Sequence, residues 1–466
     1  MNYKPSAITV EGRFAQIHIV GRRDLILTWV EKQLSVIIAM VIMAFNWHPS
    51  AMNPQTHFSI SAFFYLILIA AIIGGCSLLP SNPAQDVELT LPTLQPTEPP
   101  PATQSPSPIP SKTSTVTATS RPTRTSTPAL TPQPGSACIS YYDSRNQSLK
   151  YSCSINGRWE SDIVDNSSDV GKFSSLAFDR QNNPHISYFD NTQSSLKYAT
   201  QNREDWIIET VDRDVSASFT SLALDGNGSP FIAYVGGTNG DIRVAHYVEN
   251  AWDIETVDEI GPIEDPNSIE YVSPALTLIN GSPVLSYFDY RRGLLQYARK
   301  IDHQWEIETI DQGNVGKFSS IGFNDLGEIW ISYFDSQNQD LKLAHQGRRG
   351  WSIETIDSNG QVGEYTSLAI DQDGFPHIAY FDEGQDNLKY AYWNGQSWYV
   401  KTIDSYLNTG FYPSIALDRN DAPYIAYYYY TGRYLRVAIG SGGELQSVDQ
   451  SGAAGLYPSI SFNFND

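Results

Sequence analysis

Carboxylates and aromatic residues that recur at regular intervals have the clearest chemical potential in this sequence. Five aspartates each end a short apolar segment, namely Asp143, Asp190, Asp289, Asp335 and Asp382, and the last four are candidates for ligand binding. A carboxylate accepts hydrogen bonds from hydroxyl groups, and an aromatic face packs well against the apolar face of a sugar ring. The pattern predicts a site for a carbohydrate or a cation. A structural role stays open, because aspartates also start turns and aromatic residues also pack between repeats.

Departures from the recurring pattern are more informative than the pattern itself. After Asp289 the chain reads Tyr290-Arg291-Arg292, an unusual basic pair, and the same unit contains the enlarged acidic segment 259–270. The arginines are candidates for ligand binding, and the alternative is that they neutralise the neighbouring acidic segment.

A second departure lies near the end of the chain. Tyr429, Tyr430 and Arg433 stand where other units carry a Phe-Asp pair. An exposed aromatic cluster with an arginine is typical of a recognition surface, although tyrosines that point inward would explain part of the cluster.

Signatures of catalysis and of metal binding are missing from the sequence. It contains no HExxH, nucleophile elbow, phosphate loop or CxxC pair. The loops 335–340 and 382–386 lack a complete calcium-ligand pattern. We therefore predict no catalytic residue, no metal and no cofactor, and we lean against an enzyme. A glycoside hydrolase or lyase ranks last, because no unit presents a unique pair of carboxylates.

The elements that must position these residues are short β-patterned segments, four to a unit of about 47 residues. The first segment carries an anchor serine that recurs seven times, at Ser175, Ser221, Ser273, Ser320, Ser367, Ser414 and Ser459. Segments two to four alone begin the repeat region, and segment one alone ends it. These halves complement each other, so we predict an all-β, seven-bladed β-propeller with four antiparallel strands per blade over residues 137–466. An open solenoid is the alternative.

Chain direction then assigns residues to faces. The link from segment four to the next segment one is the longest, so segment one should be innermost. Segment one begins on the face where segments two and four end, which we call the top face. All the ligand-binding candidates named above map to the top face. Tryptophans begin the outermost segment in six of the seven units, and we expect them to pack between blades or cover the rim.

The turn Asp371-Gln-Asp-Gly374 is similar to a turn in sialidase-type propellers. The chain departs from that family because it lacks the Asp-box serine and tryptophan, and no arginine triad occupies equivalent blades. Residues 137–466 also resemble tandem propeller repeats of exported bacterial proteins. Both resemblances imply architecture only.

The N-terminal part of the chain is distinct. Residues 58–73 form an apolar run without charge, followed by Ile73-Gly74-Gly75-Cys76, which resembles the bacterial lipobox. The resemblance implies a lipoprotein in which Cys76 receives lipid and anchors the protein to a membrane, outside the cytoplasm. An uncleaved anchor helix is the alternative.

Two further segments flank this signal. Residues 1–57 form an extension to which we assign no fold, and either Met1 or Met52 could be the true start. Residues 77–136 are rich in Pro, Ser and Thr, which predicts a disordered, extended stalk.

The remaining cysteines, Cys138 and Cys153, lie in segments two and three of the first unit. If the hairpin pairs Asp143 with Ser148, the two cysteines face each other directly, within disulfide range. We predict a cross-strand disulfide near the point where the two ends of the propeller meet.

The formal net charge is −21, which argues against nucleic acid as a partner. The leading hypothesis is an exported, monomeric binding module that recognises carbohydrate or another extracellular ligand through its top face. The alternative is a protein-interaction scaffold.

Overall fold

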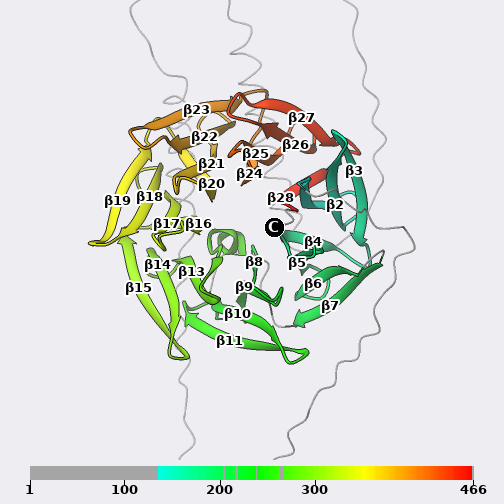
Figure 1. Ribbon diagram of the computed structural model, residues 1–466, viewed down its shortest axis with the longest axis horizontal. Helices are drawn as coiled ribbons and strands as arrows, with labels where there is room; N and C mark the ends of the chain where they lie inside the picture. Colours follow the sequence, from blue (N-terminus) through cyan, green and yellow to red (C-terminus); the bar gives the residue numbers. More distant parts are fainter. Residues whose placement is uncertain are drawn as a thin grey trace, which may run out of the picture. The chain divides into compact units, whose positions relative to one another are not determined.

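The protein is a seven-bladed β-propeller in which every blade is a sheet of four antiparallel strands. This computed structural model describes residues 135–463, except 203–204, 214, 216–218, 238 and 263–265. The predictions for residues 1–57, for 58–76 with Cys76, and for the stalk up to residue 134 lie outside the described residues. Figure 1 shows the blades arranged around a central axis.

The innermost strand of each blade is the first segment of the repeat, as predicted. The inner strands are β4 (Val170–Phe178), β8 (Ser221–Leu224), β12 (Ala275–Ile279), β16 (Val315–Phe323), β20 (Val362–Ile370), β24 (Phe411–Leu417) and β28 (Ala454–Phe462). The second strands are β1 (Ala137–Asp143), β5 (Pro184–Asp190), β9 (Pro230–Gly236), β13 (Ser282–Asp289), β17 (Ile329–Asp335), β21 (Pro376–Asp382) and β25 (Pro423–Tyr429).

The outer half of each blade is a hairpin of the third and fourth segments. The third strands are β2 (Ser148–Ile155), β6 (Ser195–Asn202), β10 (Asp241–Val248), β14 (Leu294–Ile301), β18 (Asp340–Gly347), β22 (Asn387–Trp393) and β26 (Tyr434–Ile439). The outer strands are β3 (Arg158–Asp165), β7 (Asp205–Asp212), β11 (Ala251–Glu259), β15 (Gln304–Gln312), β19 (Gly350–Asp357), β23 (Trp398–Asp404) and β27 (Glu444–Asp449). A short 3-10 helix, η1 (Pro266–Tyr271), precedes β12.

Blade 1 joins the two ends of the propeller, as the complementary half-units predict. Its strand order is β28-β1-β2-β3, and Ile139 pairs with Ile460. Blades 2 to 7 follow in chain order, from β4–β7 to β24–β27. Joining the ends in one sheet leaves no blade with an unpaired inner strand.

The predicted disulfide is confirmed. Asp143 pairs with Ser148, which places Cys138 opposite Cys153 with their Cα atoms 4.1 Å apart, and the two sulfurs are bonded. The bond therefore links two strands of the blade that joins the chain ends.

The hydrophobic core lies between adjacent blades. One cluster joins Cys138, Leu149 and Tyr151 of blade 1 to Ile186 and Trp206 of blade 2. Alternating side chains of a strand point to its two faces, so each blade buries one face against each neighbour. The blades therefore stabilise one another in sequence around the ring.

The tryptophans of the outer strands link neighbouring blades, which is one of the two expected structural roles. The indole N–H of Trp252 donates to Glu209 of the preceding blade at 3.1 Å. Equivalent bonds join Trp159 to Gln446, Trp305 to Glu255 and Trp398 to Glu354.

Candidate ligand-binding site

The aspartates that end the second strands point into the protein. Four ligand-binding candidates belong to this group and have at most 4% of their surface exposed: Asp190, Asp289, Asp335 and Asp382. Asp190 is typical, because its Oδ1 accepts the backbone N–H groups of Thr192 and Gln193, both at 3.0 Å. These carboxylates therefore fix the turns on the top face, which is the structural alternative that the sequence left open.

The aspartates that end the outer strands bind the next blade. Asp357 accepts the hydroxyl of buried Tyr380 at 2.6 Å and the ammonium of Lys389. All seven junctions contain such a pair: Tyr141–Asp449, Tyr188–Asp165, Tyr234–Asp212, Tyr287–Asp258, Tyr333–Asp311, Tyr380–Asp357 and Tyr427–Asp404. In six of these pairs the aspartate also forms an ion pair with a lysine or arginine. In blade 4, Gln296 occupies the position of that cation.

The contacts of Asp311 favour its ionised form. Burial alone would raise the pKa of Asp311, but hydrogen bonds from Lys342 and Tyr333 hold it below its ordinary value. Burial also raises the pKa of Tyr333, so its hydroxyl remains a donor. This second group of carboxylates is likewise committed to the fold.

The aromatic residues two positions before the anchor serines close the top of the central channel. They are Phe173, Phe219, Tyr271, Phe318, Tyr365, Tyr412 and Tyr457. The ring centroids of Phe318 and Tyr365 are 4.2 Å apart, and those of Tyr365 and Tyr412 are 4.6 Å apart. Phe219 and Tyr412, which belong to blades far apart in the sequence, approach to 6.3 Å. A ligand on the axis would therefore meet a layer of aromatic rings.

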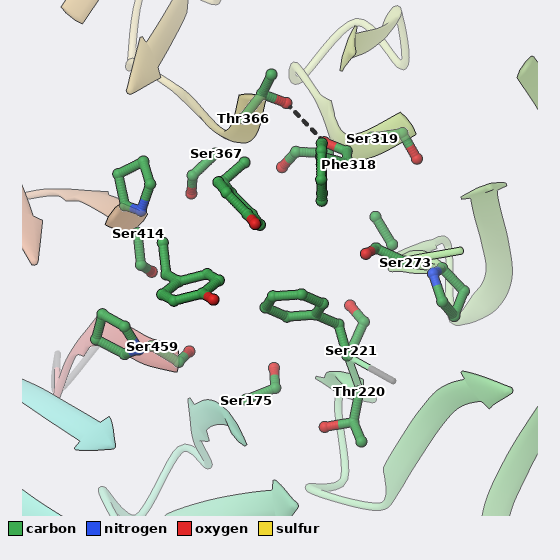
Figure 2. A pocket seen from close by; sticks show the side chains of 18 of the residues that line it. Ser175, Thr220, Ser221, Ser273, Phe318, Ser319, Thr366, Ser367, Ser414 and Ser459 are labelled. Carbon is green, nitrogen blue, oxygen red and sulfur yellow. Dashed lines mark hydrogen bonds between the residues drawn. The ribbon is translucent and has the colours of Figure 1, made fainter. Parts of the chain in front are cut away.

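Below these rings lies a cavity of about 180 Å³, surrounded by serine and threonine side chains (Figure 2). Most anchor serines are already used by the fold. Ser320 Oγ accepts the backbone N–H of Leu368 in the next blade at 3.1 Å. Equivalent bonds involve Ser175, Ser221, Ser367, Ser414 and Ser459.

Ser273 departs from this arrangement. Its hydroxyl donates instead to the carbonyl oxygen of Glu270, at 2.8 Å. Glu270 belongs to η1, which the enlarged segment 259–270 adds to blade 4. The exception therefore lies where the sequence departs most from the repeat.

The segment that contains η1 brings a carboxylate to the aromatic layer. The hydroxyl of Tyr457 approaches Glu270 Oε1 at 3.4 Å. Burial raises the pKa of Glu270, and the bond from Tyr457 opposes that rise. Glu270 thus faces the channel mouth rather than the arginines of the basic pair.

A basic pocket lies beside η1 on the top face. It has a volume of about 650 Å³ and is lined by Pro262, Ser268, Tyr271, Tyr290, Arg291, Asn314 and Lys317. The ammonium of Lys317 lies 4.1 Å from the centre of the Tyr271 ring, a cation–π contact. Burial lowers the pKa of Lys317, and the charge of Glu364 opposes this effect.

The two arginines of the basic pair separate. Arg292 pairs with Asp289 of its own turn at 3.3 Å, whereas Arg291 extends beside Gly261 and lines the pocket. Among the residues that the structure describes, no carboxylate lies within ion-pairing distance of Arg291 or Lys317. Glu264 and Asp265 fall outside that set. The pocket therefore combines two cations with tyrosine rings, which suits an anionic ligand with some apolar surface.

Glu364 lies near this pocket, in the position equivalent to Lys317 in the next blade. Burial, followed by the charge of Glu383, raises its pKa to about 7, and Lys317 opposes the rise. The carboxyl group is therefore half-protonated near neutral pH.

The second predicted patch is only partly exposed. Tyr429 is buried against Arg436, whose guanidinium carbon lies 3.8 Å from the ring centre. Tyr430 is 59% exposed, and Arg433 is also exposed. Tyr406 and Leu407, which we did not single out from the sequence, are 60% and 58% exposed.

Sequence reasoning identified Tyr290 and Arg291 but missed Tyr271 and Lys317 as their companions. Tyr271 is one of the aromatic residues that recur two positions before the anchor serines. The sequence does contain a signal for Lys317. The residue before the recurring aromatic differs in charge between units: it is a lysine at Lys172 and Lys317 but a glutamate at Glu270 and Glu364. Its position beside Arg291 depends on the contact between two blades, which no repeat alignment shows.

Other site types find no support in the described part of the chain. No group of three His, Cys, Asp or Glu side chains there could hold a metal ion. No helix in the same part is long and apolar enough to cross a membrane.

Comparisons with known proteins assign this chain to no family. No family model and no curated protein matches the sequence. Similar solved structures include a functionally unknown protein from Desulfotomaculum acetoxidans, with 12% identity and a TM-score of 0.46, covering 71% of this chain and 99% of the other. A protein of unknown function from Dyadobacter fermentans has 10% identity, a TM-score of 0.41 and coverage of 62% and 94%. A Hadza microbial sialidase has 10% identity, a TM-score of 0.40 and coverage of 68% and 73%.

Proposed function

We propose that this protein is a non-enzymatic binding module whose basic pocket holds an acidic carbohydrate, such as a uronic acid polymer. The observation that carries the proposal is the placement of Arg291 and Lys317 beside Tyr271 and Tyr290 in one cavity. Arginine binds a planar carboxylate through two parallel hydrogen bonds. Tyrosine rings offer a surface for the apolar face of the sugar.

The charge of the whole molecule makes this pocket selective. The formal net charge is −21, so the surrounding surface repels polyanions in general. An acidic ligand must gain more from the two cations than it loses to that repulsion. We therefore expect a short acidic segment or chain end to bind, and we expect affinity to fall as ionic strength rises.

We further propose that the protein is exported and held by lipid on Cys76, with residues 77–136 as a stalk. Gly135 donates its backbone N–H to Asn463, so the described chain enters and leaves the propeller at the same place. That place is the start of the second strand, on the face opposite the basic pocket. A tether attached there leaves the pocket open to extracellular ligands. Labelling of Cys76 by a fatty-acid analogue in cells, lost in Cys76→Ala, tests the anchor.

Binding of the unlipidated chain from Ser77 onward to oligogalacturonate and to uncharged dextran tests the ligand class. We expect calorimetry to detect oligogalacturonate only, and we expect Arg291→Ala and Lys317→Ala each to weaken binding about tenfold or more, as for a lost charge-assisted bond. The matched control is Arg292→Ala, because Arg292 pairs with Asp289 and does not line the pocket. Equal loss in all three variants, or no binding of any acidic oligosaccharide, would contradict the proposal.

The alternative function, a protein-interaction scaffold, is favoured by one further observation. Tyr406, Leu407 and Tyr430 form an exposed apolar patch on two loops that are bonded together. Tyr430 N–H donates to Asn408 at 3.0 Å, and Thr431 Oγ1 donates to Leu407 at 2.7 Å. Rigid exposed aromatics are typical of interaction surfaces. Under this alternative, Tyr406→Ser with Tyr430→Ser abolishes capture of a protein partner, whereas Arg291→Ala does not.

A further inference from the structure

A crevice lined by tryptophans opens between blades 5 and 6, apart from the basic pocket. Its volume is about 200 Å³, and its walls include Trp330, Leu343, Glu354, Trp393 and Trp398. Trp393 and Trp398 are both partly exposed. The crevice therefore presents two accessible indole rings at the junction of blades 5 and 6.

The crevice exists because a bulky side chain is missing. At three other junctions a tyrosine of the third strand packs edge-on against the tryptophan of the next blade, with centroids 5.2 to 5.5 Å apart: Tyr151–Trp206, Tyr198–Trp252 and Tyr297–Trp351. Leu343 occupies the tyrosine position in blade 5, since it pairs with Glu354 as Tyr198 pairs with Glu209. Trp398 therefore lacks the tyrosine ring that these three junctions place against the tryptophan.

A second substitution keeps the space open. At the junction of blades 3 and 4 the tyrosine position is also aliphatic, as Val244. There Lys300 lies 5.9 Å from the Trp305 ring centre and donates to both carboxylate oxygens of Glu255 at 2.6 Å. In blade 6 the position of Lys300 is held by Trp393, because both residues pair with the first tryptophan of the outer strand. An indole thus replaces the ammonium group that lies over the tryptophan at the junction of blades 3 and 4. Val437 of blade 7 is a third aliphatic residue at the tyrosine position.

The polar groups of the crevice complete its chemistry. Trp393 and Trp398 have ring centroids 5.7 Å apart and planes tilted by 58°, so they form two walls. The Trp398 N–H donates to Glu354 Oε2 at 3.2 Å, and Glu354 is exposed. Unlike Glu255, Glu354 forms no ion pair among the described residues, and its carboxylate can accept further hydrogen bonds from hydroxyl groups.

We propose that this crevice is a second binding site, and that it takes an uncharged pyranose ring. Indole faces pack against the C–H groups of such a ring, while Glu354 and the nearby Ser352 bond its hydroxyls. The negative charge of Glu354 disfavours an acidic sugar. The site therefore selects the opposite class of ligand from the basic pocket, and it stands whether or not that pocket binds acidic carbohydrate.

The test uses the chain from Ser77 onward, titrated with maltohexaose, cellohexaose, mannohexaose and chitohexaose and followed by calorimetry and tryptophan fluorescence. We expect at least one of these to bind with a Kd of about 1 mM or tighter. Leu343→Tyr supplies the ring that three other junctions contain, so it should abolish binding while the melting temperature stays the same or rises. Trp393→Ala should weaken binding about tenfold or more, as expected for a lost aromatic contact.

Arg291→Ala separates this site from the basic pocket, because it should leave neutral oligosaccharide binding unchanged. The proposal is overturned if none of the four oligosaccharides binds, or if binding survives Leu343→Tyr in a folded protein. Should Leu343→Tyr not fold, Trp393→Ala and Glu354→Ala decide the matter, and unchanged binding in both rejects the site.

Discussion

At the scale of single residues, the side chains that recur in the blades are not the ones available to bind a ligand. The tyrosines that recur in each blade are buried and bond an aspartate of the neighbouring blade, whereas the second-strand aspartates hold turns. The residues available to a ligand are those that differ between blades, such as Arg291 and Lys317. A side chain that every blade needs for packing has few polar atoms left for a ligand.

The tyrosine–aspartate pairs should contribute measurably to stability. Tyr380→Phe removes the hydroxyl that donates to Asp357 at 2.6 Å and leaves the ring in place. We expect the free energy of unfolding to fall by about 1.5–3 kcal/mol, as for a hydrogen bond to a charged group. Chemical denaturation measures the change, with Tyr399→Phe as the control because that side chain is 49% exposed. Equal effects of the two variants would refute the assigned role.

Glu364 predicts a dependence of stability on pH. Burial raises its pKa from 4.5 to about 7, so the native carboxyl group binds a proton more tightly than the unfolded one. Native stability is therefore lost as pH rises from about 4.5 to about 7, by up to ~3 kcal/mol. Glu364→Gln removes this loss. The free energy of unfolding of the variant, measured in urea, should therefore rise relative to that of the wild type between pH 5 and pH 8. Glu160→Gln, at an exposed position in blade 1, provides a comparison, and parallel pH profiles for wild type and Glu364→Gln would show the prediction to be wrong.

At the scale of elements, an irregularity in the inner strand places the aromatic layer. Phe173, Phe318, Tyr365, Tyr412 and Tyr457 all have φ between 52° and 55°. This left-handed conformation is unfavourable for bulky residues and persists only where the surrounding structure enforces it. The register between inner and second strands shifts at the same place, as between Glu364 and Ser367. The shift turns the ring towards the axis instead of into the blade.

Glycine two residues before the aromatic makes this geometry possible. Gly363 has a φ of 108°, and a Cβ there would lie 2.7 Å from the Cα of Leu341. Gly363→Ala should therefore destabilise the protein by about 3 kcal/mol or more, because it adds a backbone clash to the strain. Gly360→Ala is a matched control, since Gly360 has a similar φ of 105° but open space around it. Thermal denaturation should show the larger loss for Gly363→Ala, and the reverse order would contradict this explanation.

The sequence predicted the strands but not the side-chain contacts between blades. Alternating apolar residues and the spacing of the anchor serines predicted the strands, their order and the Cys138–Cys153 register, because these depend on local periodicity. The basic pocket and the crevice arise where two blades meet with unequal side chains, as at Leu343 and Trp398. Such contacts depend on the rotation of one blade against the next, which a one-dimensional pattern does not contain.

At the scale of the whole molecule, closure of the ring is reinforced at the seam. Blade 1 takes β28 from the C-terminal end, and the disulfide links β1 to β2 within that sheet. The Tyr141–Asp449 pair adds a bond between blades 1 and 7. Strands at chain termini otherwise fray most readily.

Loss of the disulfide should weaken this seam first. The bond spans 15 residues, so Cys138→Ser with Cys153→Ser should cost about 3 kcal/mol of stability. Hydrogen exchange should accelerate in β1, β2 and β28 more than in β16–β19 of blade 5. Uniform acceleration in all blades, or an unchanged melting temperature, would rule out a special role for the bond at the seam.

Blade 1 is built from both ends of the described chain. The ring of blades should therefore fold equally well with the chain ends placed in another blade. Because Gly135 and Asn463 are hydrogen-bonded neighbours, a short peptide can join them, and new ends can be opened in another hairpin turn. Such a circularly permuted protein would move the chain ends to a different sector while it left both cavities untouched. The place at which another segment is attached can thus be changed independently of the two cavities.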